Sequence, residues 1–169
     1  MSHTTRKPRP GEEHGVHYHF VSVEQFQRMQ HDQEFLESAR VFDNYYGTSE
    51  ASVREQLQSG SDVILEIDWQ GARQVRQRFG DAVSIFIVPP SIAALRQRLS
   101  SRGQDSSEII ERRMADALSE MSHFDEYDYI VVNDQFARAV EDLEAVMRSQ
   151  HLLLQRQRGS VPLQRKAGF

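Results

Sequence analysis

The sequence predicts an α/β domain in which a parallel sheet is flanked by helices. Three short apolar runs carry this prediction, because each is rich in β-branched residues and is followed by a segment with helical spacing. The runs lie within residues 63–71, 83–90 and 127–134. Strands that alternate with helices in this way are typical of doubly wound α/β folds.

The composition narrows the class of protein. The 169 residues fit one domain. The chain has no cysteine, which excludes disulfides, thiolate metal sites and a cysteine nucleophile. A net charge of −5 argues against a general nucleic-acid binder, and no apolar run approaches the roughly 20 residues of a membrane span. We therefore expect a soluble, cytoplasmic protein that binds neither nucleic acid nor membranes.

The first twenty residues combine basic, hydroxyl and imidazole side chains. Two prolines and a glycine in residues 8–11 predict irregular structure after a short extended piece. Arg6 and Arg9 offer planar donors suited to phosphate, although the residues alone favour a frayed basic tail over an oxyanion site. The spacing of His14, His17 and His19 suggests a metal, but without a carboxylate partner set we expect exposed loop histidines and no metal site.

The remaining elements follow from caps and spacing. Ser22 with Gln25 forms a capping box, and Gly60 stops a helix that begins near Thr48 or Ser49. Two tyrosines before Gly47 suit a strand that ends in a turn. Helical spacing predicts helices over residues 22–32, 49–59, 71–79, 91–102, 105–121 and 135–147.

Asp68 follows the first of the three apolar runs. In open α/β sheets, ligands collect outside the carboxyl ends of the strands, so an acid at this point suits a metal or a sugar hydroxyl. An equally good interpretation is that Glu66 and Asp68 only cap the next helix. The spacing alone does not separate these two interpretations.

Taken together, these segments resemble guanylate kinase from Ser2 to about Leu154. The resemblance rests on the motifs at residues 2–12, 35–37, 44–48, 67–71, 98–104 and 130–134. It implies transfer of the γ-phosphoryl group of ATP to GMP with Mg²⁺, in a P-loop kinase fold over residues 1–154. It also implies a GMP-binding region at about 5–60 and a helical lid at about 98–113, followed by a loosely ordered tail at 155–169.

The same resemblance assigns roles to single residues. Those that resemble ligands of the GMP phosphate are Ser2, Arg6, Arg9, Tyr18 and Tyr46. Glu37 and Thr48 resemble the pair that reads guanine, and Asp68 resembles the acid beside the GMP and the metal. The residues that resemble lid arginines at the transferring phosphoryl group are Arg98, Arg102 and Arg113, and Asn133 resembles a residue near the adenine of ATP.

One expected motif is absent from these residues. P-loop kinases hold the ATP phosphates with a Gly-x-x-Gly-x-Gly-Lys-Ser/Thr loop after their first strand, and neither Lys7 nor Lys166 lies in such a loop. We expect a fold without the first strand and the P-loop, and a chain whose activity is doubtful. The alternatives are an incomplete active kinase, a short form that only binds GMP, and a module for phosphorylated peptides. The third leaves Glu37 and the lid arginines without a task.

Overall fold

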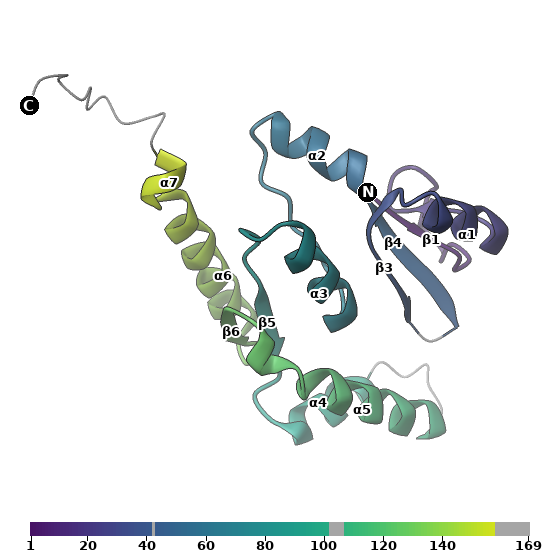
Figure 1. Cartoon of the computed structure of the whole chain (residues 1–169). Coiled ribbons are helices and arrows are strands. Elements are labelled where there is room, and N and C mark those ends of the chain that lie inside the picture. The colour runs from purple at the N-terminus through teal and green to yellow at the C-terminus, as the bar shows by residue number, and fades with distance from the viewer. Residues whose placement is uncertain (42, 102–106, 158–169) are drawn as a thin grey trace, which may run out of the picture. The chain divides into compact units, whose positions relative to one another are not determined.

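The computed structural model describes residues 1–41, 43–101 and 107–157 (Figure 1). The chain forms two compact units, Met1–Val83 and Ser84–Phe169. No helix in these described ranges is long and apolar enough to cross a membrane. The predicted tail begins within the last short helix, α7 (Leu154–Gln157), and its residues 158–169 lie outside the described part of the chain.

The first unit contains a mixed four-stranded sheet with the order β2-β1-β4-β3. Its strands are β1 (Ser2–Thr4), β2 (His19–Phe20), β3 (Phe35–Val41) and β4 (Asn44–Ser49). β1 pairs in parallel with β2 and antiparallel with β4, and β3 and β4 are also antiparallel. β3 is therefore an edge strand of this sheet.

Aromatic side chains form the core beside the strands. Phe26 is fully buried, and its ring stacks on Phe35 at 4.6 Å and on Tyr45 at 5.4 Å between centroids. Gly47 lies under this cluster, since a Cβ there would come within 3.0 Å of the Phe35 ring. The prediction that the strand ends in a turn at Gly47 was wrong. The strand continues to Ser49, because the glycine makes room for the rings within the strand.

Three helices complete the first unit: α1 (Val23–His31), α2 (Glu50–Gln58) and α3 (Trp69–Arg78). The predicted cap of α1 is confirmed, since Ser22 Oγ accepts a hydrogen bond from the Gln25 backbone at 3.1 Å. Ser49 caps α2 in the same way, at 3.4 Å from the Ser52 nitrogen. Gly60 follows α2 with φ of 84°, the left-handed conformation expected after a helix end.

The first apolar run is the main departure from the predicted fold. Residues 61–68 form neither strand nor helix, and Ile64 is 72% exposed. The prediction of a strand buried on both faces was therefore wrong. Among the described residues no strand pairs with this segment, so its backbone makes no hydrogen bonds of a sheet. A strand-like composition alone is not sufficient to form a strand.

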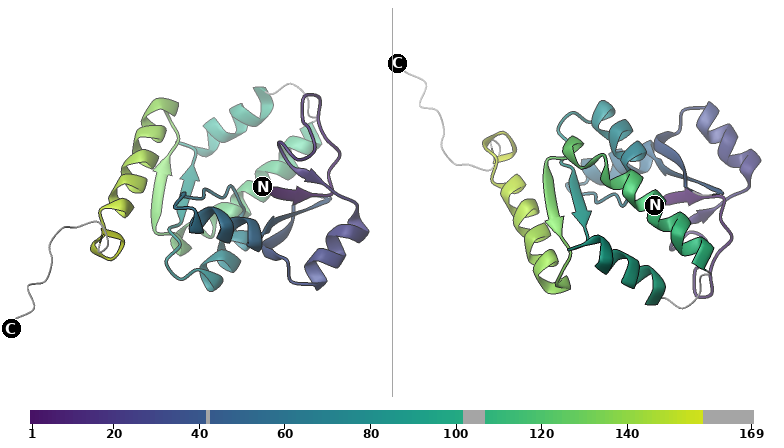
Figure 2. Two further views of the ribbon diagram at one scale, coloured as in Figure 1. Left: turned by 90° about the horizontal axis from the view of Figure 1, so that it is seen from above. Right: turned by 90° about the horizontal axis from the view of Figure 1, so that it is seen from below.

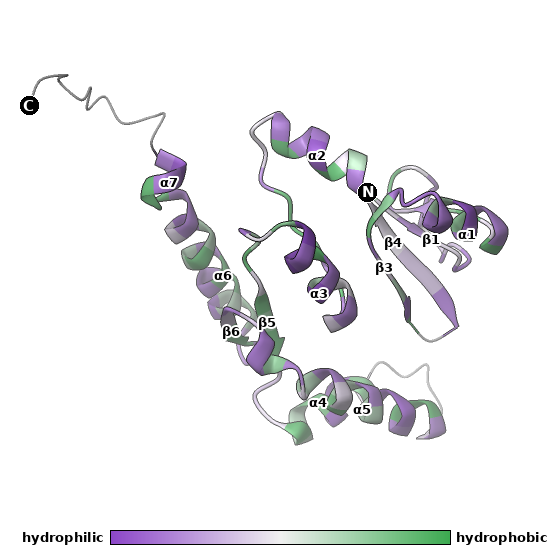
Figure 3. Ribbon diagram, viewed as in Figure 1, coloured by the Kyte–Doolittle hydropathy of each residue, from purple (hydrophilic) through white to green (hydrophobic). Residues whose placement is uncertain are grey.

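The second unit is built on a parallel pair, β5 (Ile85–Val88) and β6 (Tyr129–Val132). Figure 3 shows β5 as a hydrophobic strand, as its sequence predicts. Helix α6 (Phe136–His151) lies beside this pair in both views of Figure 2. The other elements are α4 (Ile92–Ser101), α5 (Ser107–Met121) and a 3-10 turn at Phe124–Glu126.

Side-chain contacts fix the ends of this pair. The Asp128 carboxylate accepts hydrogen bonds from the Ser84 backbone at 2.8 Å and from its hydroxyl at 2.7 Å, which holds the starts of the two strands together. Ser91 caps α4 as predicted, at 3.0 Å from the Ala94 nitrogen. The strands predicted at the second and third apolar runs form and pair in parallel. The prediction that the second run is a buried strand was wrong, because Phe86 and Val131 are buried whereas Ile87 and Ile130 are half exposed.

Candidate functional site

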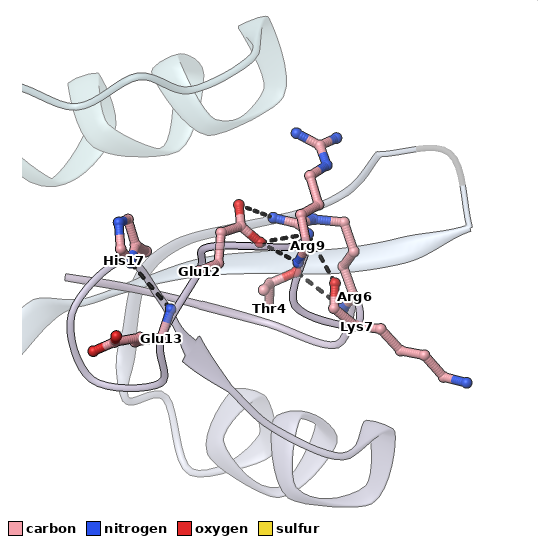
Figure 4. Close-up of polar contacts among 7 residues, drawn as sticks. All are labelled: Thr4, Arg6, Lys7, Arg9, Glu12, Glu13 and His17. Carbon is pink, nitrogen blue, oxygen red and sulfur yellow. Dashed lines mark hydrogen bonds and ion pairs between the residues drawn. The ribbon is translucent and has the colours of Figure 1, made fainter. Parts of the chain in front are cut away.

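The segment after β1 is folded around a carboxylate that sequence analysis did not select. Arg6 and Glu12 form a two-point ion pair, with both nitrogen–oxygen distances at 2.9 Å (Figure 4). Glu12 also accepts a hydrogen bond from the Arg9 backbone at 2.7 Å. The hydrogen bonds from Arg6 are the main reason that the pKa of Glu12 falls to about 2. The residue-level preference for a frayed tail was therefore wrong, because Glu12 closes the segment into a loop.

Aromatic rings hold the other side of the Arg6 guanidinium. Its central carbon lies 5.6 Å from the centre of the Tyr18 ring and 5.8 Å from that of Phe20. The guanidinium also donates a hydrogen bond to the Tyr46 side chain. Three predicted phosphate ligands, Arg6, Tyr18 and Tyr46, thus lie together, whereas Arg9 is exposed and contacts Glu12 through its backbone.

The predicted guanine-reading pair is assembled across two strands. Glu37 on β3 is paired with Thr48 on β4, and both are almost fully buried, at 4% and 2% exposed. The side chain and the backbone of Thr48 partly offset the rise in the pKa of the Glu37 carboxyl that burial causes. The Thr48 hydroxyl also lies 3.2 Å from the Ser2 hydroxyl. β1, β4 and β3 therefore bring Ser2, Thr48 and Glu37 side by side across the sheet.

Burial makes the Glu37 carboxylate ready to accept donors. The pKa of Glu37 is raised, first by desolvation and further by the negative charge of Asp68. A buried carboxylate that ionises needs hydrogen-bond donors or positive charge to replace lost water. Thr48 supplies part of this need among the described residues, so a ligand with two adjacent N–H donors would suit the remaining lone pairs.

Asp68 occupies the N-cap position of α3. Its Oδ1 accepts a hydrogen bond from the Gly71 backbone at 2.8 Å, which confirms that Asp68 caps this helix. Capping uses one carboxylate oxygen, so the ligand interpretation stays a prediction. Gly71 also lies against Glu37, because a Cβ at Gly71 would come within 2.8 Å of Glu37 Oε2.

A cavity of about 270 Å³ lies among these side chains. Its lining residues are Ser2, Tyr18, Glu37, Ala39, Val41, Tyr46, Gly47, Glu66, Ile67 and Asp68. All of them belong to the first unit, Met1–Val83. Five of the lining residues were predicted from the sequence as phosphate, base or acid ligands, so the structure brings most of the predicted acceptor site together.

The remaining predicted site residues belong to the second unit. Arg98 on α4 donates to the Asn133 carbonyl oxygen at 2.8 Å, so these two predicted residues meet within that unit. Arg113 lies on α5 and is partly buried. Arg102 lies outside the described residues.

The histidines of the amino-terminal segment contact one another. His3 and His19 stack with centroids 4.6 Å apart, and His14 meets His19 edge-on at 5.5 Å. Burial and the neighbouring His19 lower the pKa of His3 to about 4. In the described part of the chain, no group of three or more His, Cys, Asp or Glu residues is arranged to hold a metal ion.

Sequence reasoning missed three residues that support the site. Glu12 lies within a motif that was noted, and its signal was a carboxylate beyond a Pro-Gly turn from two arginines. Gly71 stands where α3 approaches Glu37. Gln74 bonds to the backbone next to Glu37, at 3.1 and 2.9 Å, and nothing in its sequence context distinguished it from other glutamines.

Comparisons with known proteins point to one family. The family model described as guanylate kinase matches residues 1–150. A guanylate kinase of Methylobacillus flagellatus is 57% identical over 157 residues, which are 93% of this chain and 78% of that protein. A guanylate kinase of Pseudomonas savastanoi pv. phaseolicola is 59% identical over 157 residues, 93% of this chain and 73% of its own. The crystal structure of guanylate kinase from Anaplasma phagocytophilum is similar with a TM-score of 0.77 and 31% identity, covering 96% of this chain and 84% of that one.

Proposed function

The chain belongs to the guanylate kinase family, and we propose that its first unit binds GMP as the acceptor of a phosphoryl group from ATP. The observation that carries the proposal is the buried pair of Glu37 and Thr48, of which Glu37 lines the cavity. The acceptor site is contained in Met1–Val83, so it can be tested by binding alone.

The chemistry of Glu37 suits guanine. An ionised carboxylate accepts hydrogen bonds from both N1–H and the 2-amino group of guanine, whereas adenine offers no such pair. A buried acceptor left unpaired by the wrong base is costly, so the site should reject AMP strongly. The raised pKa of Glu37 fits this role, because the carboxylate lacks full solvation until donors of the base arrive.

The phosphate of GMP would lie at the other side of the cavity. Arg6 supplies a fixed positive charge, and the hydroxyls of Ser2, Tyr18 and Tyr46 supply neutral donors. The ion pair with Glu12 keeps the guanidinium plane in place before the ligand binds. Arg9, exposed beside this loop, would add a second charge when phosphate is bound.

Phosphoryl transfer would then depend on charge and position. A phosphate oxygen of GMP attacks the γ-phosphorus of ATP, and ADP leaves. Mg²⁺ would accompany ATP and neutralise its phosphates, and Asp68 is the cavity acid proposed to face that metal. Mg²⁺ usually keeps only one or two protein carboxylates and takes phosphate oxygens as further ligands, which fits a metal that Asp68 would contact beside the ATP phosphates.

Residues of the second unit are proposed for the donor side. Arg98, Arg102 and Arg113 would neutralise the transferring group, and Asn133 would lie near the adenine. The 169 residues include no glycine-rich loop with a lysine. We therefore propose that the 169 residues provide the GMP half of the site. Their own turnover would be negligible, since contacts to the β- and γ-phosphates of ATP are essential to this reaction.

Titration calorimetry of the 169-residue protein tests this proposal. GMP should bind and AMP should not, and MgATP should give no measurable heat. Glu37→Gln should weaken GMP by roughly 1 to 3 kcal/mol, because an amide cannot accept from both donors. Glu34→Gln is the matched control, since Glu34 is exposed three residues earlier. Equal affinity for GMP and AMP, or no effect of Glu37→Gln, would refute the proposed base contact.

A further inference from the structure

Gln74 makes two hydrogen bonds to the residue that follows Glu37. Its side-chain oxygen accepts from the Ser38 backbone N–H at 3.1 Å, and its side-chain nitrogen donates to the Ser38 carbonyl at 2.9 Å. β3 is an edge strand, so in the part of the chain that the structure describes no strand lies beside these two backbone groups on that side. The Gln74 amide satisfies both, as a residue of a paired strand would.

The opposite end of this contact is fixed on α3. Gln74 lies one turn after Gly71, the residue whose backbone abuts the Glu37 carboxylate. Its side-chain nitrogen also lies 3.2 Å from the Gln70 carbonyl, within the same helix. α3 thus approaches β3 at two adjacent places, the Ser38 backbone and the Glu37 side chain, and its N-cap is Asp68.

Glu37 needs such support because of its place in the strand. The β3–β4 register shifts between Phe35 and Glu37, which leaves Leu36 as a bulge immediately before the carboxylate. Bulges bend the strand and re-aim the side chains beside them. Gln74 bonds the Ser38 backbone, next to Glu37, on the side of β3 that faces away from β4.

We propose that Gln74 is a positioning residue, which holds the Glu37 carboxylate where it distinguishes the 2-amino group of guanine. The inference rests on the proposed function, because it concerns how the same pair reads the base. Loss of the Gln74 amide leaves the Ser38 N–H and C=O without these partners, and the strand can then shift at Glu37. The Glu37 carboxylate would remain buried, but its two oxygens would no longer face the two adjacent N–H donors of guanine at the same time.

The test compares GMP with IMP, which retains N1–H but lacks the 2-amino group. Gln74→Met keeps the length and the apolar stem of the side chain and removes both hydrogen bonds. Gln77→Met is the matched control, because Gln77 is exposed one turn later on the same helix. The full 169-residue chain of each variant is titrated with both nucleotides, and thermal unfolding is recorded in parallel.

A positioning role predicts that Gln74→Met lowers the ratio of GMP to IMP affinity by about fivefold or more, as expected when one hydrogen bond is weakened. Gln77→Met should leave the ratio unchanged. An unfolded fraction lowers both apparent affinities equally, so the ratio separates positioning from stability. If the wild type prefers GMP and Gln74→Met keeps the same ratio, the role of Gln74 is overturned. If the wild type shows no preference for GMP over IMP, the proposed base contact itself fails.

Discussion

Gly71 offers a way to move the Glu37 carboxylate without disturbing its burial. A methyl group added at Gly71 would meet Glu37 Oε2 at 2.8 Å, Ile67 Cβ at 3.2 Å and Asp68 Oδ1 at 3.4 Å. Gly71 is helical and has no positive φ, so alanine fits its backbone conformation. The Asp68 cap uses the Gly71 backbone N–H, which alanine retains.

The size of the effect follows from the closest of these contacts. Carbon and oxygen normally approach to about 3.3 Å, so the carboxylate must retreat by about 0.5 Å. The carboxylate is the free end of a flexible side chain, so it moves more readily than the helix. Weakening two charge-assisted hydrogen bonds to guanine would cost about 1.5 to 3 kcal/mol, or roughly a 10- to 150-fold loss of GMP affinity. Alanine is the better helix former by about 1 kcal/mol, and the tight contact with Ile67 Cβ offsets part of this gain, so folding stability should stay close to that of the wild type.

Calorimetry with GMP and thermal unfolding together decide this prediction. Gly71→Ala should lose affinity while its melting temperature stays close to that of the wild type. Gly80→Ala is the control, because a Cβ there meets nothing within 4 Å. Undiminished GMP affinity in Gly71→Ala would show that the contact with the base does not depend on the position of the Glu37 carboxylate. If the melting temperature fell together with the affinity, the loss of GMP binding would be explained by destabilised folding and not by a displaced carboxylate.

Two further predictions concern stability against pH, measured as urea unfolding midpoints. The pKa of His3 falls from 6.5 to about 4 on folding, since burial and His19 oppose its charge, so stability should fall as the pH drops from 6.5 towards 4. His3→Gln should flatten the profile in that window, and an unchanged slope would contradict this. The pKa of Glu12 falls from 4.5 to about 2 through its bonds with Arg6, so its stabilisation is present above pH 4.5 and is lost towards pH 2. Glu12→Gln should lower the midpoint at pH 6 and remove that acid-dependent loss, whereas an equal midpoint at pH 6 would show that the ion pair contributes nothing.

Local signals in the sequence predicted much of the fold. The caps at Ser22, Ser49 and Ser91 depend on a few neighbouring residues, and each forms as expected. The pairing of Glu37 with Thr48 was found through the resemblance to a family and not through spacing, since the two residues meet only through the β3–β4 register. Contacts of that kind depend on how strands align, which a single sequence does not show.

The failures have a common physical reason. Residues 63–67 have a buried strand's composition, but a strand also requires a partner to bond its backbone, and Ile64 is exposed among the described residues. The basic residues 6–9 favour a solvated tail only when the carboxylate that binds Arg6 is left out. Glu12 turns Arg6 from a mobile charge into a fixed one, at 15% side-chain exposure. Propensity and composition describe residues one at a time. Whether residues 63–67 form a strand depends on a second strand, and whether Arg6 is held in place depends on Glu12.

Apolar periodicity in the sequence could not reveal the residues that support Glu37, because none of these residues has an apolar side chain. Asp68, Gly71 and Gln74 recur every three residues, so they fall on neighbouring turns of one face of α3. That face meets β3 through the bare backbone of Gly71 and the side-chain amide of Gln74, and neither contact is hydrophobic. Apolar spacing in this helix marks Ala72 and Val75 instead. A helix that must hold a buried carboxylate in place uses polar contacts on the face beside it, so in α3 the pattern that matters for function differs from the pattern that predicts the helix.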